Sequence, residues 1–370
     1  MLLRTEGNAR ELMSAGCVTE RYTQDGWQWA EVLTRTLAEE GSPDAALKLL
    51  LAVPATPEVW AAASGLGSEL ADIYWSRMNP WSTGPDHARE LVELLIEHGR
   101  SWYAVQLLAQ RALTETATLD DKTIQLIVKA LDGALAADAS AETPVGAGDY
   151  EVDQLLGILR GSDVPLDRVA GLEWAFFPLL EGLHGTPALF SKLSSDPAFF
   201  VELVSLAFRP EDAPAGESDA GDARIALNAY QVLGAWRTIP GTTGDSIDSD
   251  QLMDWVRRTR ELLVGAGRLD IGDQQIGQML SASPPGRDGA WPHESVRDAV
   301  EASESQHIII GFRIGAFNAR GVTSRGLLEG GAQERALAKR YRSWAAAVRK
   351  RWPRTASALD ELAHGYERDA

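Results

Sequence analysis

A pattern of 21 residues occurs twice in this chain, at residues 30–50 and at residues 88–108. Both copies read A-x-x-L-x-x-x-L-x-E-x-G-x-x-x-x-A-x-x-L-L, and no gap is needed to align them. Leucines four positions apart lie on one face of a helix, and glycine readily adopts the left-handed conformation that ends a helix. The pattern therefore predicts a helical hairpin, with a small alanine where the two backbones approach closely.

The same helical spacing of apolar residues extends over nearly the whole chain. Proline in a first helical turn loses no hydrogen bond, so Pro43 and Pro57 predict helix starts after Ser42 and Thr56. A further long helix is expected from Glu58 to Met78, between the two copies. We therefore predict an all-α fold in which helical hairpins stack as an α-solenoid.

The repeated pattern resembles the tetratricopeptide repeat. Glycine and alanine keep the family's spacing in Gly41/Ala46 and in Gly99/Ala104, and a leucine precedes each turn at the family's position. The copies are 58 residues apart, whereas the family repeats every 34. The resemblance implies a degenerate helical repeat that binds a protein or peptide. Trp352-Pro353 and the leucines after it resemble the start of another unit.

Two stretches rich in Ala, Gly, Pro, Ser and acidic residues lack apolar periodicity and are typical of linkers. They are residues 137–149 and 210–223, and they divide the chain into three predicted helical blocks. These blocks are the N-terminal repeat block 1–136, the middle block 150–209 and the C-terminal block 224–370.

One run is ambiguous between a strand and a helix. His307-Ile308-Ile309-Ile310 is β-branched, which is typical of a strand. The residues before it have a helical pattern, and Gly311 and Gly315 are four positions apart. This spacing favours a helix that packs closely through its glycines.

Charge and cysteine content limit the class of protein. The chain has 53 acidic and 35 basic residues, a net charge of −18, which opposes non-specific binding to DNA or to an anionic membrane. One cysteine, Cys17, forms no internal disulfide, which fits a reducing compartment. The N-terminus shows no signal peptide and no apolar run is long enough to span a bilayer. We expect a cytoplasmic protein, and the excess of Arg over Lys is typical of a GC-rich bacterial genome.

The familiar signatures of catalysis are missing from the sequence. There is no phosphate-binding G-x-x-x-x-G-K-[ST], no G-x-S-x-G and no H-E-x-x-H. The six histidines are scattered, and residues 245–250 resemble a calcium loop but lack its glycine and distal glutamate. That stretch predicts a capped helix start instead, and His293-Glu294 predicts another. We therefore expect no enzyme, no cofactor and no metal.

One segment differs in charge from the rest of the chain. Residues 306–354 hold eleven basic and two acidic residues, with a Gly/Arg-rich stretch ahead of an Arg-rich helix. This pattern is typical of a site for an anionic ligand, such as a nucleotide, a nucleic acid or an acidic protein face. In the alternative interpretation, these bases pair with acids of the same chain. The candidate binding residues are Arg320, Arg325, Arg335, Lys339, Arg340 and Arg342.

Residues 315–342 also resemble helical C-terminal regions of large bacterial multidomain proteins. The shared order is G-x-x-N-x-R-G-V-x-x-R followed by E-G-G-x-x-E-R-x-L-A-x-x-Y-R. Such proteins carry an effector or NTPase module upstream, some of them in phage defence. The resemblance implies that this chain is the sensor or scaffold part of something longer.

Three functions remain open from the sequence. The leading prediction is a non-enzymatic helical-repeat scaffold that binds a protein or peptide partner. The second is a nucleic-acid or nucleotide sensor that uses residues 313–354. The third is an enzyme whose site carries no recognisable motif.

Overall fold

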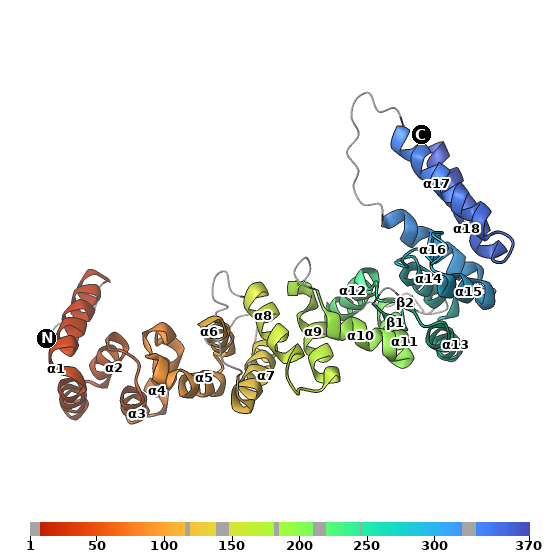
Figure 1. The fold of residues 1–370 in the computed structure, drawn as a ribbon. Coiled ribbons are helices and arrows are strands. Elements are labelled where there is room, and N and C mark those ends of the chain that lie inside the picture. The colour runs from red at the N-terminus through yellow and green to blue at the C-terminus, as the bar shows by residue number, and fades with distance from the viewer. Residues whose placement is uncertain are drawn as a thin grey trace. The chain divides into compact units, whose positions relative to one another are not determined.

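The structure is a computed structural model that describes residues 8–114, 119–137, 148–180, 185–209, 220–244, 246–319 and 331–370. These residues form eighteen α-helices, two 3₁₀ helices and one hairpin of two-residue strands, so the predicted all-α class is confirmed. The chain divides into two compact units, shown in Figure 1. Unit 1 is Met1–Val164 with Gly182–His184, and unit 2 is Pro165–Glu181 with Gly185–Ala370.

Unit 1 is built from helices in which neighbours along the chain pack against one another (Figure 1). They are α1 (Asn8–Glu39), α2 (Pro43–Ala52), α3 (Pro57–Ser64), α4 (Ser68–Arg77), η2 (Pro80–Ser82), η3 (Pro85–His87), α5 (Ala88–Glu97), α6 (Ser101–Thr114), α7 (Asp121–Ala136) and α8 (Asp149–Arg160). The predicted starts at Pro43 and Pro57 are confirmed. The long helix expected from Glu58 to Met78 is wrong, because Gly67, with φ of 101°, separates α3 from α4.

The repeated sequence pattern forms two hairpins with the same turn. Gly41 and Gly99 have φ values of 71° and 73°, the left-handed conformation that the pattern predicts. The residue after each glycine donates its backbone N–H to the carbonyl five residues earlier, from Ser42 to Leu37 at 2.8 Å and from Arg100 to Leu95 at 2.7 Å. The alanines Ala46 and Ala104 are fully buried, as expected for positions of close helix contact.

Unit 2 contains the remaining helices and the short strand pair. They are α9 (Leu166–Leu180), α10 (Pro187–Ser195), α11 (Pro197–Ala207), α12 (Ala220–Ala235), β1 (Thr242–Thr243), β2 (Ser246–Ile247), α13 (Ser249–Gly265), α14 (Leu269–Leu280), α15 (Glu294–Ser303), α16 (Gln306–Asn318), α17 (Ala332–Val348) and α18 (Pro353–Arg368). Its core includes a cluster of aromatic rings in which Phe200 lies 5.5 Å from Trp236 and 5.3 Å from Trp255 between ring centroids.

Helices α13 and α14 form a third hairpin with the same turn as the two in unit 1. Gly267 has φ of 64°, and Arg268 donates its backbone N–H to the Leu263 carbonyl at 2.9 Å. Gly272 takes the position of Ala46 and Ala104, five residues after the turn glycine. A β-carbon at Gly272 would collide with the buried Leu263 side chain, which would have to shift to make room for it.

Helices α14 and α16 pack with their backbones in close approach. A β-carbon at Gly277 would collide with the Ile308 carbonyl, and one at Gly311 would collide with the Gln274 carbonyl. Gly315 lies in the same way against Gln278 of α14. The predicted helix over His307–Ile310 is therefore confirmed, as is its packing through glycines.

The two predicted linkers fall largely outside the residues that the structure describes. Residues 138–147 and 210–219 of the two predicted linkers lie outside the described residues. The second linker is shorter than predicted, because Ala220 already begins α12. The three-block division stays a prediction, and along the chain unit 1 ends at Val164 and unit 2 begins at Pro165.

Candidate functional site

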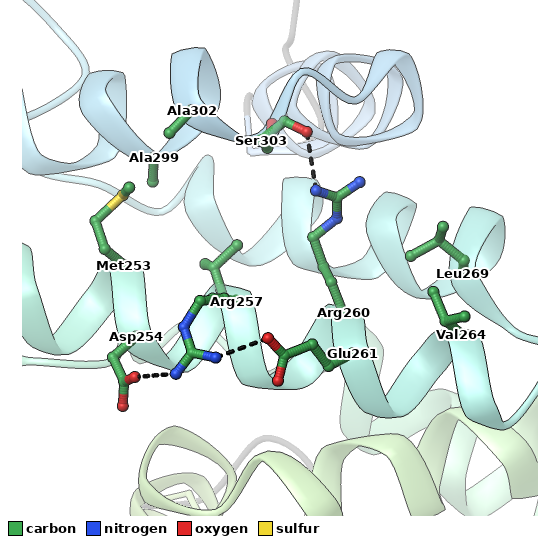
Figure 2. Close-up of a pocket in the computed structure, with 11 residues that line it drawn as sticks. Met253, Asp254, Arg257, Arg260, Glu261, Val264, Leu269, Ala299, Ala302 and Ser303 are labelled. Carbon is green, nitrogen blue, oxygen red and sulfur yellow. Dashed lines mark hydrogen bonds and ion pairs between the residues drawn. The ribbon is translucent and has the colours of Figure 1, made fainter.

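A groove with a volume of about 630 Å³ lies in unit 2 between α13 and α15 (Figure 2). Its volume is in the range of ligand-binding pockets. One wall is a stripe along α13 and the start of α14, and the other is a set of small residues on α15. The residues that line the groove are Met253, Asp254, Val256, Arg257, Arg260, Glu261, Val264, Leu269, Ala299, Ala302 and Ser303.

Local sequence determines where the two helices of the groove begin. Asp248 caps α13 by accepting a hydrogen bond from the Gln251 backbone N–H at 3.0 Å, so the predicted capped start is confirmed. His293 caps α15 through Nδ1, which accepts from the Ser295 N–H at 3.2 Å, and this predicted start is also confirmed. The left-handed Glu304, with φ of 50°, follows the last residue of α15.

The apolar part of the groove is partly open to solvent. Val264 is 62% exposed, although α13 packs against α11, α14 and α15. Ala299 is buried at the base of the groove, whereas Ala302 is exposed at its edge. Along α13, the stripe from Met253 to Val264 is about 16 Å long at 1.5 Å per residue. The groove therefore has the length of about three helical turns.

Arg260 is held in the groove by two hydrogen bonds to residues outside α13. Its Nε donates to Asp273 Oδ1 at 3.0 Å, and its Nη1 donates to the Ser303 carbonyl at 2.9 Å. Asp273 is only 1% exposed, so a buried carboxylate fixes the guanidinium from behind. Figure 2 shows the contact of Arg260 with Ser303, and neither hydrogen bond of Arg260 uses its second terminal nitrogen, Nη2. The groove thus combines apolar surface with one oriented hydrogen-bond donor.

The outer rim of the groove is a chain of ion pairs along α13. Arg257 donates to Asp254 at 2.7 Å and to Glu261 at 2.7 Å, and Arg258 pairs with Asp254 at 2.8 Å. The hydrogen bond from Arg257 holds the pKa of Asp254 below its usual value, and these acids raise the pKa of Arg257. The rim charges are therefore satisfied within α13 and screened by solvent.

The described part of the chain shows neither a metal-binding group nor a membrane span. No three His, Cys, Asp or Glu side chains converge on a common point there. No helix in the same residues is both long and apolar enough to cross a bilayer. The chemistry that the groove offers is that of binding: burial of apolar surface and donation of hydrogen bonds from Arg260.

Four of the six predicted anionic-ligand residues are described, and they lie outside the groove. Arg320 and Arg325 fall outside the described residues. The other four, Arg335, Lys339, Arg340 and Arg342, are exposed on α17. The structure therefore brings these four onto one helix, but it does not place them in the groove between α13 and α15.

Several bases of this segment pair with acids of the same chain. Arg342 donates two hydrogen bonds to Glu367, at 2.8 and 2.7 Å, and the carboxylate raises the pKa of Arg342. Further pairs join Arg313 to Glu361, Arg349 to Asp360 at 2.6 Å and Arg351 to Asp298 at 3.6 Å. These pairs support the interpretation that the basic segment neutralises acids of its own chain, and an anionic-ligand site there stays a prediction.

The groove residues were missed at the sequence level, although a signal for them exists. A sequence alignment without gaps, at an offset of 168 residues, pairs the residues of α5–α6 with those of α13–α14. Identical residues at that offset are Arg89 and Arg257, Glu93 and Glu261, Leu94 and Leu262, Leu95 and Leu263, Gly99 and Gly267, Arg100 and Arg268, Gln106 and Gln274, and Gln110 and Gln278. A search at this longer spacing finds the third hairpin, and with it the helix that lines the groove.

No protein-family model, no curated protein and no solved structure matches this chain. The geometry and chemistry of the groove therefore carry the functional argument.

Proposed function

We propose that this protein is a non-enzymatic helical-repeat scaffold, an α-solenoid of degenerate tetratricopeptide type, that binds a protein or peptide partner. Three hairpins with the same glycine turn support a repeat architecture. Stacked hairpins leave surface grooves whose side chains vary without disturbing the turns, which suits them to bind other chains. The protein acts in the cytoplasm as the sensor or scaffold module of a larger bacterial protein.

The groove between α13 and α15 carries this proposal. Its apolar stripe, with Val264 62% exposed, gains free energy when a partner covers it. Small residues on α15, such as Ala302, let another backbone approach closely. An amphipathic helix laid into a hydrophobic groove is a recurrent mode of peptide recognition, and the length of about three turns fits it.

The test compares two tryptophan substitutions in pull-downs from the parent cell extract. Ala302→Trp fills the groove, and Ala347→Trp places the same side chain on the exposed face of α17, outside the groove. We expect the wild-type protein and Ala347→Trp to retain one discrete partner and Ala302→Trp to lose it. Recovery of no discrete partner, or equal recovery by all three proteins, would contradict the proposal.

A further inference from the structure

The groove between α13 and α15 contains a hydrogen-bond donor that nothing in the described residues uses. Arg260 donates through Nε and Nη1, but its Nη2 has no hydrogen-bond partner in that part of the chain. The neighbouring Arg257 differs, because both its terminal nitrogens donate to acids of α13. Arg260 is therefore the arginine of the groove that remains available to a ligand.

The position of Arg260 makes its free donor select partners that carry a hydrogen-bond acceptor at one point of the groove. The guanidinium is held in place by buried Asp273 and by the Ser303 carbonyl, so Nη2 keeps a fixed direction. A partner that covers the groove removes the water that now solvates Nη2. Because a covered donor without an acceptor is costly, a well-fitting partner supplies an oxygen at this point.

The charge around the groove indicates which oxygen fits. Four charged side chains line the groove, and Arg257 is paired with Asp254 and Glu261, which leaves Arg260 as the cation whose partner lies outside α13. Asp273 lies behind Arg260 and is buried, so the groove meets the positive side of the pair. Hydrogen bonds between a guanidinium and a carboxylate are about twice as strong as neutral ones.

We propose that the groove binds an amphipathic helix of a partner protein and that Arg260 Nη2 donates a hydrogen bond to one Asp or Glu of that helix. This inference rests on the function proposed above. The apolar face of the partner helix covers Val264 and Ala302. Its carboxylate lies beside that face, at the end near Ser303. Arg260 is thus a specificity-determining residue, and an uncharged polar side chain in place of the carboxylate weakens binding.

The experiment uses the full chain and a phage-displayed library of random 16-residue peptides. Selected peptides are synthesised with a fluorescent label, and their dissociation constants are measured by anisotropy. We expect apolar residues at helical spacing with one Asp or Glu beside them. Changing that residue of the peptide to Asn or Gln is expected to weaken binding to the wild-type chain about tenfold, a loss of about 1.4 kcal/mol.

The matched protein variants assign this loss to Arg260. With Arg260→Gln, the acidic peptide and its amide form are expected to bind equally. With Arg258→Gln, on the exposed side of the same helix, the tenfold difference is expected to remain. Arg260→Lys keeps the charge without Nη2 and is expected to reduce the difference. Circular dichroism verifies that each variant is folded, and the peptide substitution tests the wild-type chain directly.

The outcomes separate this inference from the proposed function. Peptides that lose binding to Ala302→Trp but tolerate the acid-to-amide change would overturn the role of Arg260 and leave the groove as a binding site. Selection of no peptide, or of peptides that bind Ala302→Trp unchanged, would overturn both. A loss of discrimination in Arg260→Gln alone supports both.

Discussion

Helix α5 of unit 1 and helix α13 of unit 2 begin equivalent hairpins, yet one side of each helix differs. Both end in the same glycine turn, and an arginine after the glycine reaches the end of an earlier helix in each case. Arg100 donates to the carbonyls of Trp75 and Met78, and Arg268 donates to the Phe208 carbonyl. The hairpin and its arginine thus recur in both units.

The difference lies on the side of the hairpin that meets the next helix. Val92 of α5 is fully buried, whereas the equivalent residue of α13 is Arg260, which faces the groove. Arg89 of α5 donates to Asp120 at the start of α7, whereas the equivalent Arg257 pairs within α13. The comparison shows that the same turn is compatible with different residues on this side of the hairpin. The side is closed by a valine in unit 1 and is open around an arginine in unit 2.

The largest effect on stability is expected when the arginine found in unit 2 replaces the equivalent valine of unit 1. Val92→Arg buries a charge without a partner, and we expect it to lower the free energy of unfolding by about 4 kcal/mol. Denaturant unfolding followed by circular dichroism measures the change. The control is Val264→Arg, which adds the same side chain at an exposed position and is expected to cost no more than about 0.5 kcal/mol. Similar losses in the two variants would contradict the difference in packing.

The reverse exchange tests how far Arg260 and Asp273 depend on each other. Arg260→Leu leaves the buried Asp273 carboxylate unpaired, and we expect a loss of about 3 kcal/mol. The double variant Arg260→Leu/Asp273→Leu is expected to recover most of that loss, because replacing a buried pair by apolar residues is often nearly neutral. Denaturant unfolding measures the free energy of unfolding of both variants. A double variant that is less stable than the single one would show that the pair does not act as a unit.

The turns themselves are expected to respond alike in the two units. Gly99→Ala and Gly267→Ala each force a β-carbon into the left-handed conformation, at a cost of about 1–2 kcal/mol. No neighbouring atom obstructs either β-carbon, so conformational strain alone sets the cost. Gly365→Ala, in open space on α18, is the control and is expected to be stabilising by about 0.5–1 kcal/mol. A clear difference between the two turn variants would refute their equivalence.

The smallest effect concerns Asp120, which accepts hydrogen bonds across the closed side of α5. Hydrogen bonds from Thr123, and then from Arg89, lower the pKa of Asp120 to about 2. Because the folded pKa lies below the unfolded value of about 3.9, the stability that it contributes is present above pH 4 and is lost as the pH falls towards 2. Carboxyl NMR titration measures the pKa.

Two variants divide the causes of this shift. Thr123→Ala is expected to raise the pKa of Asp120 more than Arg89→Gln does, because Thr123 supplies the largest part of the lowering. A wild-type Asp120 that titrates near pH 4 would show that its cap on α7 through Thr123, as well as its contact with Arg89 of α5, is not formed in solution.

Local patterns predicted helices well and their interruptions less well. The prolines at the helix starts and the glycines at positions 41 and 99 act through their own backbone conformations, so their effect is visible in the sequence. The break at Gly67 was missed because apolar spacing continues across it. The β-branched run from His307 to Ile310 was resolved by Gly311 and Gly315, whose spacing indicated a close helix contact.

The sequence by itself determined the all-helical class, the glycine turns of the hairpins and the absence of familiar catalytic motifs, because each depends on residues close together in the chain. The tertiary structure alone decided that Asp273 and Ser303, 13 and 43 residues from Arg260, hold its side chain in place. It also decided that Val264 stays exposed and that Arg342 pairs with Glu367. Burial and pairing between distant residues depend on how helices pack, and that packing follows from many weak contacts that no local pattern records.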